Sequence, residues 1–318
     1  MSKRSKPAAP MSGASVAGNP VAGSNLSGNP WSLAGLSAAG LFVVLWSTGF
    51  IGAKLGLPHA EPMTFLALRF AIAAVLLGLL ALVTGAPWPK DWRSVAHLAV
   101  AGLLLHGLYL GGVFAGIDQG VEAGVSALIV GIQPVLVAAL AGVLLGERVT
   151  RRQWLGLFLA VGGVTLVVWR KLDAGLGTVE GVGLCLLALL GITAATLYQK
   201  RFCADMDLRS GSVIQYCAAG LGCGVFSLAL EDQVIVWHPD FIIAMTWLVL
   251  VLSLGAVSLL YWLIKRGAAS RVSSLFFLAP PVTALIAWPL FGETLGPTAL
   301  AGMLLTVVGV ALVNLEKS

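Results

Sequence analysis

A pattern of proline, glycine and acidic residues in the first half of the chain returns in the second half at a fixed distance. Each pair below has the same residue type and a separation of 146 positions: Pro134 and Pro280, Glu147 and Glu293, Gly156 and Gly302, Gly163 and Gly309, Lys54 and Lys200, and Gly78 and Gly224. A constant offset over such a distance indicates an internal repeat. The chain is therefore expected to contain two related units.

The composition predicts that both units lie in a lipid bilayer. The chain is 58% hydrophobic and only 10% charged, with a mean hydropathy of +0.95, whereas a soluble domain carries about 25% charged residues. The net charge of +5 does not indicate nucleic-acid binding, because the basic residues lie at the ends of apolar runs, as in membrane proteins. Two copies of an apolar unit in one membrane chain are typical of transporters.

Apolar segments of about 20 residues, the length that crosses a bilayer as a helix, follow one another along the chain. Residues 1–30 are rich in small and polar residues and are expected to form a disordered cytoplasmic tail, with one unit at 31–170 and the second at 171–318. An all-α membrane protein of ten transmembrane helices is predicted, at about residues 33–54, 62–83, 94–116, 122–145, 152–169, 180–199, 210–229, 240–264, 268–291 and 297–315.

The positions of Lys and Arg predict that both termini lie in the cytoplasm. With this orientation, most of the 19 basic residues fall in cytoplasmic segments. Five helices per unit is an odd number, so the second unit enters the membrane the opposite way round and the repeat is predicted to be inverted. Two inverted units can alternate between inward-open and outward-open states about a site near the membrane midplane.

Several motifs resemble the EamA family of the drug/metabolite transporter superfamily. They are Leu45-Trp46-Ser47-Thr48-Gly49-Phe50 with Lys54, Ala67-Leu68-Arg69-Phe70, and both copies of the run from proline through Gly-Glu to the two glycines. The resemblance covers roughly residues 35–315. It implies ten helices in a 5+5 inverted repeat, a bacterial inner-membrane location, and export or exchange of small metabolites, often amino acids. The second unit has Gln215 where the first has Arg69, so a symmetric pair of cations is not expected.

Two ionisable side chains lie within predicted membrane helices. Arg69 costs several kcal/mol in hydrocarbon unless it faces a cavity, finds a partner or reaches the interface. It could attract an anionic group such as a substrate carboxylate, or it could extend to the outer interface or bond a helix carbonyl. His106 could couple substrate to protons because imidazole titrates near neutral pH, or it could stay neutral against a backbone carbonyl. Tyr109 lies one turn from His106.

Prolines at equivalent positions predict two kinked helices beside the central site. Pro134, which follows Gln133, removes a backbone donor and leaves a carbonyl free, and Pro280 with Pro281 repeats this in the second unit. In a bilayer such groups persist only against protein or a wet cavity. The alternative is simple helix curvature.

The predicted substrate pocket combines apolar walls with a few polar groups, as small-molecule sites do. Each aromatic side chain could instead serve in packing or at the membrane interface. The predicted substrate-binding residues are Trp46, Ser47, Phe50, Arg69, His106, Tyr109, Gln133, Tyr198, Ser258, Tyr261 and Phe277.

Two acidic residues follow glycines at predicted helix ends on opposite membrane faces. Glu147 and Glu293 are expected to act as gates or caps, through contact with a nearby basic side chain or backbone amide. Lys54 and Lys200 also lie on opposite faces, and a similar role is expected for them.

Other sequence features limit the class of protein. The chain has no Walker A motif and no metal-ligand spacing, so neither a cofactor nor a metal is expected, and the four cysteines are interpreted as small buried side chains. The predicted partners are a small metabolite and the bilayer, with protons as a coupling ion and a homodimer left open. A broad exporter of drugs is the alternative. A membrane enzyme of lipid metabolism would need acidic residues and histidines clustered at one interface, so a non-enzyme is expected.

Overall fold

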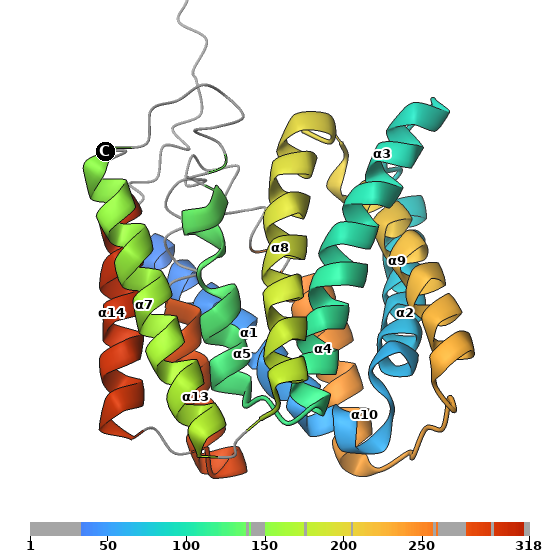
Figure 1. Cartoon of the computed structure of the whole chain (residues 1–318). Helices are drawn as coiled ribbons and strands as arrows, with labels where there is room; N and C mark the ends of the chain where they lie inside the picture. The colour runs from blue at the N-terminus through green and yellow to red at the C-terminus, as the bar shows by residue number, and fades with distance from the viewer. Residues whose placement is uncertain are drawn as a thin grey trace, which may run out of the picture.

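The computed structural model describes residues 33–137, 140, 150–174, 177–204, 206–256, 259, 278–293 and 296–314. In this part of the chain the helices lie side by side and run up and down the molecule (Figure 1), and the only extended pairing is an isolated bridge between Ala60 and Ile235. The predicted tail at residues 1–30, and the candidate residues Glu147, Ser258, Tyr261 and Phe277, lie outside the described residues.

Two helices of the first unit begin at residues that favour a helix start. Pro62 starts a helix where its missing N–H is not needed, and the Asp91 carboxylate accepts a hydrogen bond from the Ser94 amide at 2.8 Å. The described elements are α1 (Leu33–Gly56), the short turn η1 (Leu57–His59), α2 (Pro62–Val83), α3 (Trp92–Gly102), η2 (Leu103–Leu110), α4 (Gly111–Asp118), α5 (Ala123–Val130) and α7 (Arg151–Asp173).

The second unit repeats this order 146 residues later. Thr178 and Asp207 cap two of its helices by accepting from the amides of Gly181 and Arg209, at 3.0 Å and 2.9 Å. The described elements are α8 (Val179–Phe202), α9 (Leu208–Leu230), α10 (Pro239–Thr246), η3 (Trp247–Ala256), α13 (Ala279–Phe291) and α14 (Pro297–Asn314).

The lengths of these helices confirm an all-helical membrane protein. Within the described residues, six apolar helices are long enough to cross a bilayer: Gly40–His59, Pro62–Val83, Trp92–Asp118, Val179–Phe202, Leu208–Leu230 and Pro239–Ala256. Four shorter apolar helices accompany them, at Ala123–Val137, Trp154–Trp169, Ala279–Phe291 and Pro297–Gly309. The full count of ten and the orientation of the termini stay predictions.

Helices at equivalent positions of the two units pack against each other. α2 lies along α9, and α7 lies along α14 at the opposite side of the bundle (Figure 1). At the second contact, a methyl group on Gly163 would overlap the carbonyl oxygen of Gly302, and one on Gly309 would overlap that of Gly156. The repeated glycines therefore form a reciprocal interface in which the two backbones touch, as small residues allow in lipid.

Both units contain a π-helical segment at the same place. η2 spans 103–110, and η3 contains the positions 146 residues later, 249–256. Ser253 in η3 donates to the carbonyl of Leu248, five residues earlier, at 3.1 Å. A π turn inserts a residue and re-aims the side chains that follow, and such turns occur often at functional sites. The apolar sequence of these segments predicts only continuous helix.

The two proline segments differ in their place in the helices. In the first unit, backbone helix bonding is interrupted at Gly131 and Ile132, within the turn that the missing N–H of Pro134 would have closed. Pro280 and Pro281 stand in the first turn of α13, where the missing N–H groups need no partner. A Cβ atom on Gly131 would lie 2.8 Å from Cγ of Pro280, so the two proline segments do meet, through a glycine.

Candidate substrate site

A cavity of about 100 Å³ lies between the two units, bounded by α1, α2, η2, α4, α9 and η3. At about 10–15 Å³ for each water-sized group, it holds roughly seven to ten such groups, the size of a small metabolite. Five of the residues that line it belong to the predicted substrate-binding set: Trp46, Phe50, Arg69, His106 and Tyr109.

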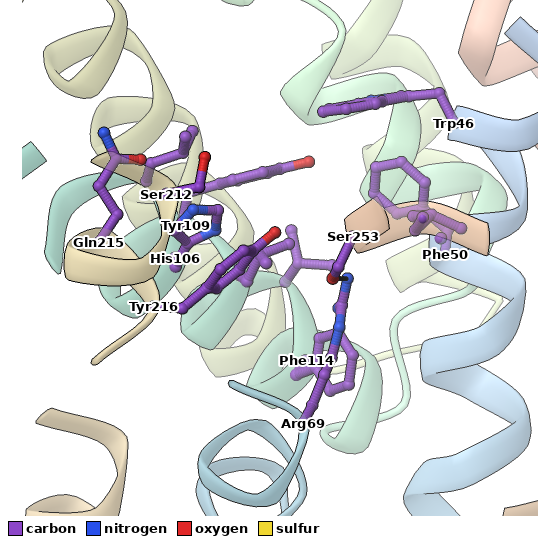
Figure 2. A pocket seen from close by; sticks show the side chains of 15 residues that line it. Trp46, Phe50, Arg69, His106, Tyr109, Phe114, Ser212, Gln215, Tyr216 and Ser253 are labelled. Atoms are coloured by element: carbon purple, nitrogen blue, oxygen red, sulfur yellow. Dashed lines mark hydrogen bonds between the residues drawn. The ribbon is translucent and has the colours of Figure 1, made fainter. Parts of the chain in front are cut away.

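Arg69 is the charged residue of this cavity. Its side chain comes from α2 and points toward Ser253 (Figure 2), and the residue is 4% exposed. Nη2 donates to Ser253 Oγ at 3.4 Å, and Nε has no hydrogen-bond partner among the described residues. The described residues that line the cavity include no carboxylate. A buried guanidinium without a counterion is costly.

His106 and its aromatic neighbours form the opposite wall. The His106 ring stacks on Tyr216 with centroids 4.4 Å apart and an interplanar angle of 28°, and the Phe70 ring lies 5.6 Å away. The side chain of Gln215 interacts with the imidazole, while Nδ1 has no partner within the described part of the chain. Nδ1 of His106 is therefore a second buried polar atom without a partner in that part of the chain.

The sequence prediction omitted ten of the lining residues, and five of these ten are aromatic or polar: Phe114, Ser212, Gln215, Tyr216 and Ser253. Figure 2 shows Ser212, Gln215 and Tyr216 on the other side of the cavity from Trp46 and Phe50, with Ser253 beside Phe50. Gln215 and Tyr216 lie 146 residues after Arg69 and Phe70, so the repeat could have identified them as the equivalents of a known candidate. Ser253 carries no such signal, because its direction depends on the π turn of η3.

Three predicted binding residues serve other contacts. Ser47 Oγ donates to the carbonyls of Val43 and Ala279, at 2.7 Å and 3.2 Å, so it joins α1 to α13. Gln133 Nε2 donates to Thr196 Oγ1 at 3.0 Å. The Tyr198 hydroxyl lies 2.8 Å from His97 Nδ1, near the end of α8 at Phe202. None of the three lines the cavity.

Glu293 binds three donors at one end of the bundle. Its carboxylate pairs with Lys54 Nζ at 2.6 Å and accepts from the amides of Ala123 and Gly124 at 2.9 Å and 3.2 Å. It therefore caps α5 in the first unit, where a negative charge also meets the positive end of the helix dipole. Gly292 directs the chain here, with a left-handed φ of 68°. Lys200, the equivalent of Lys54, is exposed.

We expect Glu293→Gln to lower the free energy of unfolding by about 1 kcal/mol, the size of a helix-terminus charge effect. The amide keeps the shape and one acceptor, but loses the charge that binds Lys54. The measurement is thermal or denaturant unfolding of the purified protein in detergent, with Asp232→Asn, an exposed acidic residue in the connection after α9, as the matched control. Equal effects at the two positions would contradict the cap.

Both units of the chain match one known protein family. The model of the EamA-like transporter family matches the chain twice, at residues 33–169 and 179–315. The chain belongs to the EamA-like transporter family. The two matches are displaced by the same 146 residues as the repeat and together cover nearly all the helices. The resemblance stated from the sequence motifs is thus confirmed.

Relatives of this EamA-like transporter cover most of its length. The uncharacterized inner membrane transporter YedA of Escherichia coli is 27% identical over 86% of this chain and 88% of its own. The probable terminal-alkyne amino-acid exporter of Streptantibioticus cattleyicolor is 27% identical over 86% and 91%. The probable amino-acid metabolite efflux pump of Salmonella typhimurium is 27% identical over 85% and 91%.

The fold and location agree with these relatives. A solved crystal structure, 18% identical, covers 88% of this chain and 96% of its own with a TM-score of 0.63, which shows a shared fold. The apolar helices and the similarity to an inner membrane transporter of Escherichia coli indicate a multi-pass protein of the inner membrane. The relatives are named as transporters, which fits a protein that is not an enzyme.

Proposed function

We propose that this transporter moves small carboxylate-bearing metabolites, amino acids or related compounds, across the inner membrane by secondary active transport. The observation that carries the proposal is the buried guanidinium of Arg69, which faces the cavity with Nε unpartnered among the described residues. A substrate carboxylate would supply the missing acceptor through a charge-assisted hydrogen bond. The names of two relatives as an amino-acid exporter and an amino-acid metabolite pump support the same substrate class.

The walls of the cavity suit the rest of such a substrate. Trp46, Phe50 and Phe114 offer apolar surface, while Tyr109 and Tyr216 combine a ring with a hydroxyl. An ammonium group would meet aromatic faces, since the described lining holds no carboxylate. The alternative from the sequence is a broad exporter of drugs or toxic compounds, and for cationic drugs it would have to place a positive ligand beside Arg69.

The Lys54–Glu293 pair supports a gate in an alternating-access cycle. It joins the end of α1 in the first unit to Glu293, two residues after the end of α13 in the second. The sequence repeat maps the pair onto Lys200 and Glu147 at the opposite face. In our proposal the two pairs form in turn, so that one end of the pathway is closed while the other is open.

A substrate panel in proteoliposomes tests the function. We expect counterflow of small amino or carboxylic acids, with and without a pH gradient, to exceed that of their methyl esters and of cationic dyes. Esterification removes the charge that Arg69 would bind and changes the size little. Equal transport of acid and ester, or transport of the cationic dyes alone, would overturn the carboxylate assignment and favour the drug exporter.

His106→Gln tests proton coupling. If the imidazole exchanges protons during the cycle, the variant is expected to lose the dependence of transport on pH, because glutamine does not titrate. His97→Gln is the matched control, since His97 pairs with Tyr198 outside the cavity. Transport by the two variants is measured across a range of pH values. A profile for His106→Gln that matches the wild type would exclude the imidazole as the coupling group.

A further inference from the structure

Two connections at the Glu293 end of the bundle are held together by their backbones. The amide of Val236 donates to the carbonyl of His59 at 2.8 Å, next to the Ala60–Ile235 bridge. Glu231 accepts from the amide of Thr64 at 2.7 Å and so caps α2 from the second unit. The η1 turn and the segment before α10, far apart in sequence, are therefore fixed relative to each other.

This backbone arrangement brings two histidines and an aspartate into one cluster. The rings of His59 and His238 stack with centroids 4.5 Å apart and an interplanar angle of 12°. His238 Nδ1 lies 3.4 Å from the carboxylate of Asp240. One ligand atom from each residue can be chosen so that all three lie within 4.8 Å of one another. Neither unit forms this cluster alone, because His59 belongs to the first and the other two residues to the second.

We propose that His59, His238 and Asp240 bind a divalent transition-metal ion such as Zn²⁺. Two imidazoles and a carboxylate are a ligand set that suits Zn²⁺ and its first-row neighbours, with water in the open position. His238 is exposed and the other two residues are partly exposed, so small side-chain rotations can shorten the present spacing to metal-ligand distances. Mg²⁺ and Ca²⁺ prefer sites made of oxygen ligands.

Without metal, the same residues have a simpler role. The His238 side chain is the N-cap of α10 and accepts from the amide of Asp240 at 3.3 Å. A bound ion would add a link from η1 to α10. α10 continues directly into η3, which carries Ser253 to the substrate cavity. The metal would thus restrain the segment of the second unit that reaches Arg69.

The test uses the full, untagged chain in detergent with Zn²⁺ alone as the probe. We expect equilibrium dialysis to give one Zn²⁺ per chain beyond that bound by the double variant His59→Asn with His238→Asn. Each single variant is expected to bind that ion roughly tenfold or more weakly, as the loss of an important contact of a metal site does. Asparagine keeps a side-chain acceptor at the N-cap of α10, so the variant separates metal binding from folding.

Matched measurements exclude other zinc ligands. His97→Asn removes a histidine outside the cluster, and Cys217→Ser removes the exposed cysteine; both should bind Zn²⁺ as the wild type does. Zn²⁺, and not Mg²⁺, should raise the unfolding temperature and slow hydrogen exchange at the start of α10. Equal zinc binding by the double variant and the wild type, or no binding by the wild type, would overturn the proposal.

Discussion

Arg69→Ala is expected to slow transport of carboxylate-bearing substrates by roughly ten- to a hundredfold while leaving the protein as stable as before or more so. A hydrogen bond to a charged group contributes about 1.5–3 kcal/mol, and each 1.4 kcal/mol is about a factor of ten. The loss should be largest for the free acid and small for its ester. Initial rates of counterflow in proteoliposomes measure the loss of transport.

The predicted effect on stability has the opposite sign from that of a structural arginine. Among the described residues Arg69 has no carboxylate partner. It makes a long hydrogen bond to Ser253 at 3.4 Å, and its guanidinium carbon lies 5.8 Å from the centroid of the Phe70 ring. Removing a buried, unpaired charge relieves its desolvation cost, although the lost packing of its aliphatic stem partly offsets this gain. The unfolding temperature of purified Arg69→Ala, compared with that of the wild type, measures the change in stability.

Two variants separate the charge from the shape of the side chain. Arg69→Lys keeps the charge but loses the planar donor fork, so we expect partial transport. Arg209→Ala removes an arginine that pairs with Asp207 outside the cavity, and it should leave transport unchanged. Normal transport by Arg69→Ala, or a large loss of stability, would rule out the role proposed for Arg69.

The second large effect is expected at Gly163, where α7 meets α14. Gly163→Ala should lower the free energy of unfolding by about 1–3 kcal/mol, the usual cost of overpacking, because the new methyl group would overlap the backbone of Gly302. Backbone cannot move aside as a side chain can, so the helices must separate. Unfolding of the purified protein in detergent is the measurement.

Gly162 provides the matched control one residue away. A Cβ atom there has no atom within 4 Å, and alanine favours helix over glycine by about 1 kcal/mol. Gly162→Ala should therefore be neutral or stabilising. Gly302→Ala should resemble Gly163→Ala, because its Cβ would lie 2.6 Å from the Gly163 carbonyl oxygen. Equal effects at Gly162 and Gly163 would show that the close backbone contact does not govern stability.

The repeat carried more information about the site than the candidate residues taken singly. It pairs Gly163 with Gly309 but Gly162 with Val308, which agrees with the contacts of α7 and α14. It also pairs Arg69 with Gln215, and the structure places both at one cavity. Helices at equivalent positions of the two units, α2 with α9 and α7 with α14, pack together, so a candidate in one unit identifies a neighbour in the other.

The direction of individual side chains could not be predicted in the same way. Ser47 and Phe50 lie on one helix, yet Phe50 lines the cavity and Ser47 bonds to Ala279. In a soluble helix the polar face shows which side is buried. Here the lipid-facing and protein-facing sides are both apolar, so the pattern of residue types does not distinguish them.

The sequence by itself determined a membrane protein of two related helical units, with a resemblance to the EamA family and an arginine within a predicted membrane helix. Length, hydropathy and a constant offset are properties of the chain, so they need no structure. Only the tertiary structure decided that Ser253 meets Arg69, that Lys54 pairs with Glu293, and that His59 lies beside His238. These contacts join the two units, and they depend on π turns and close glycine contacts that set how each helix is rotated and spaced.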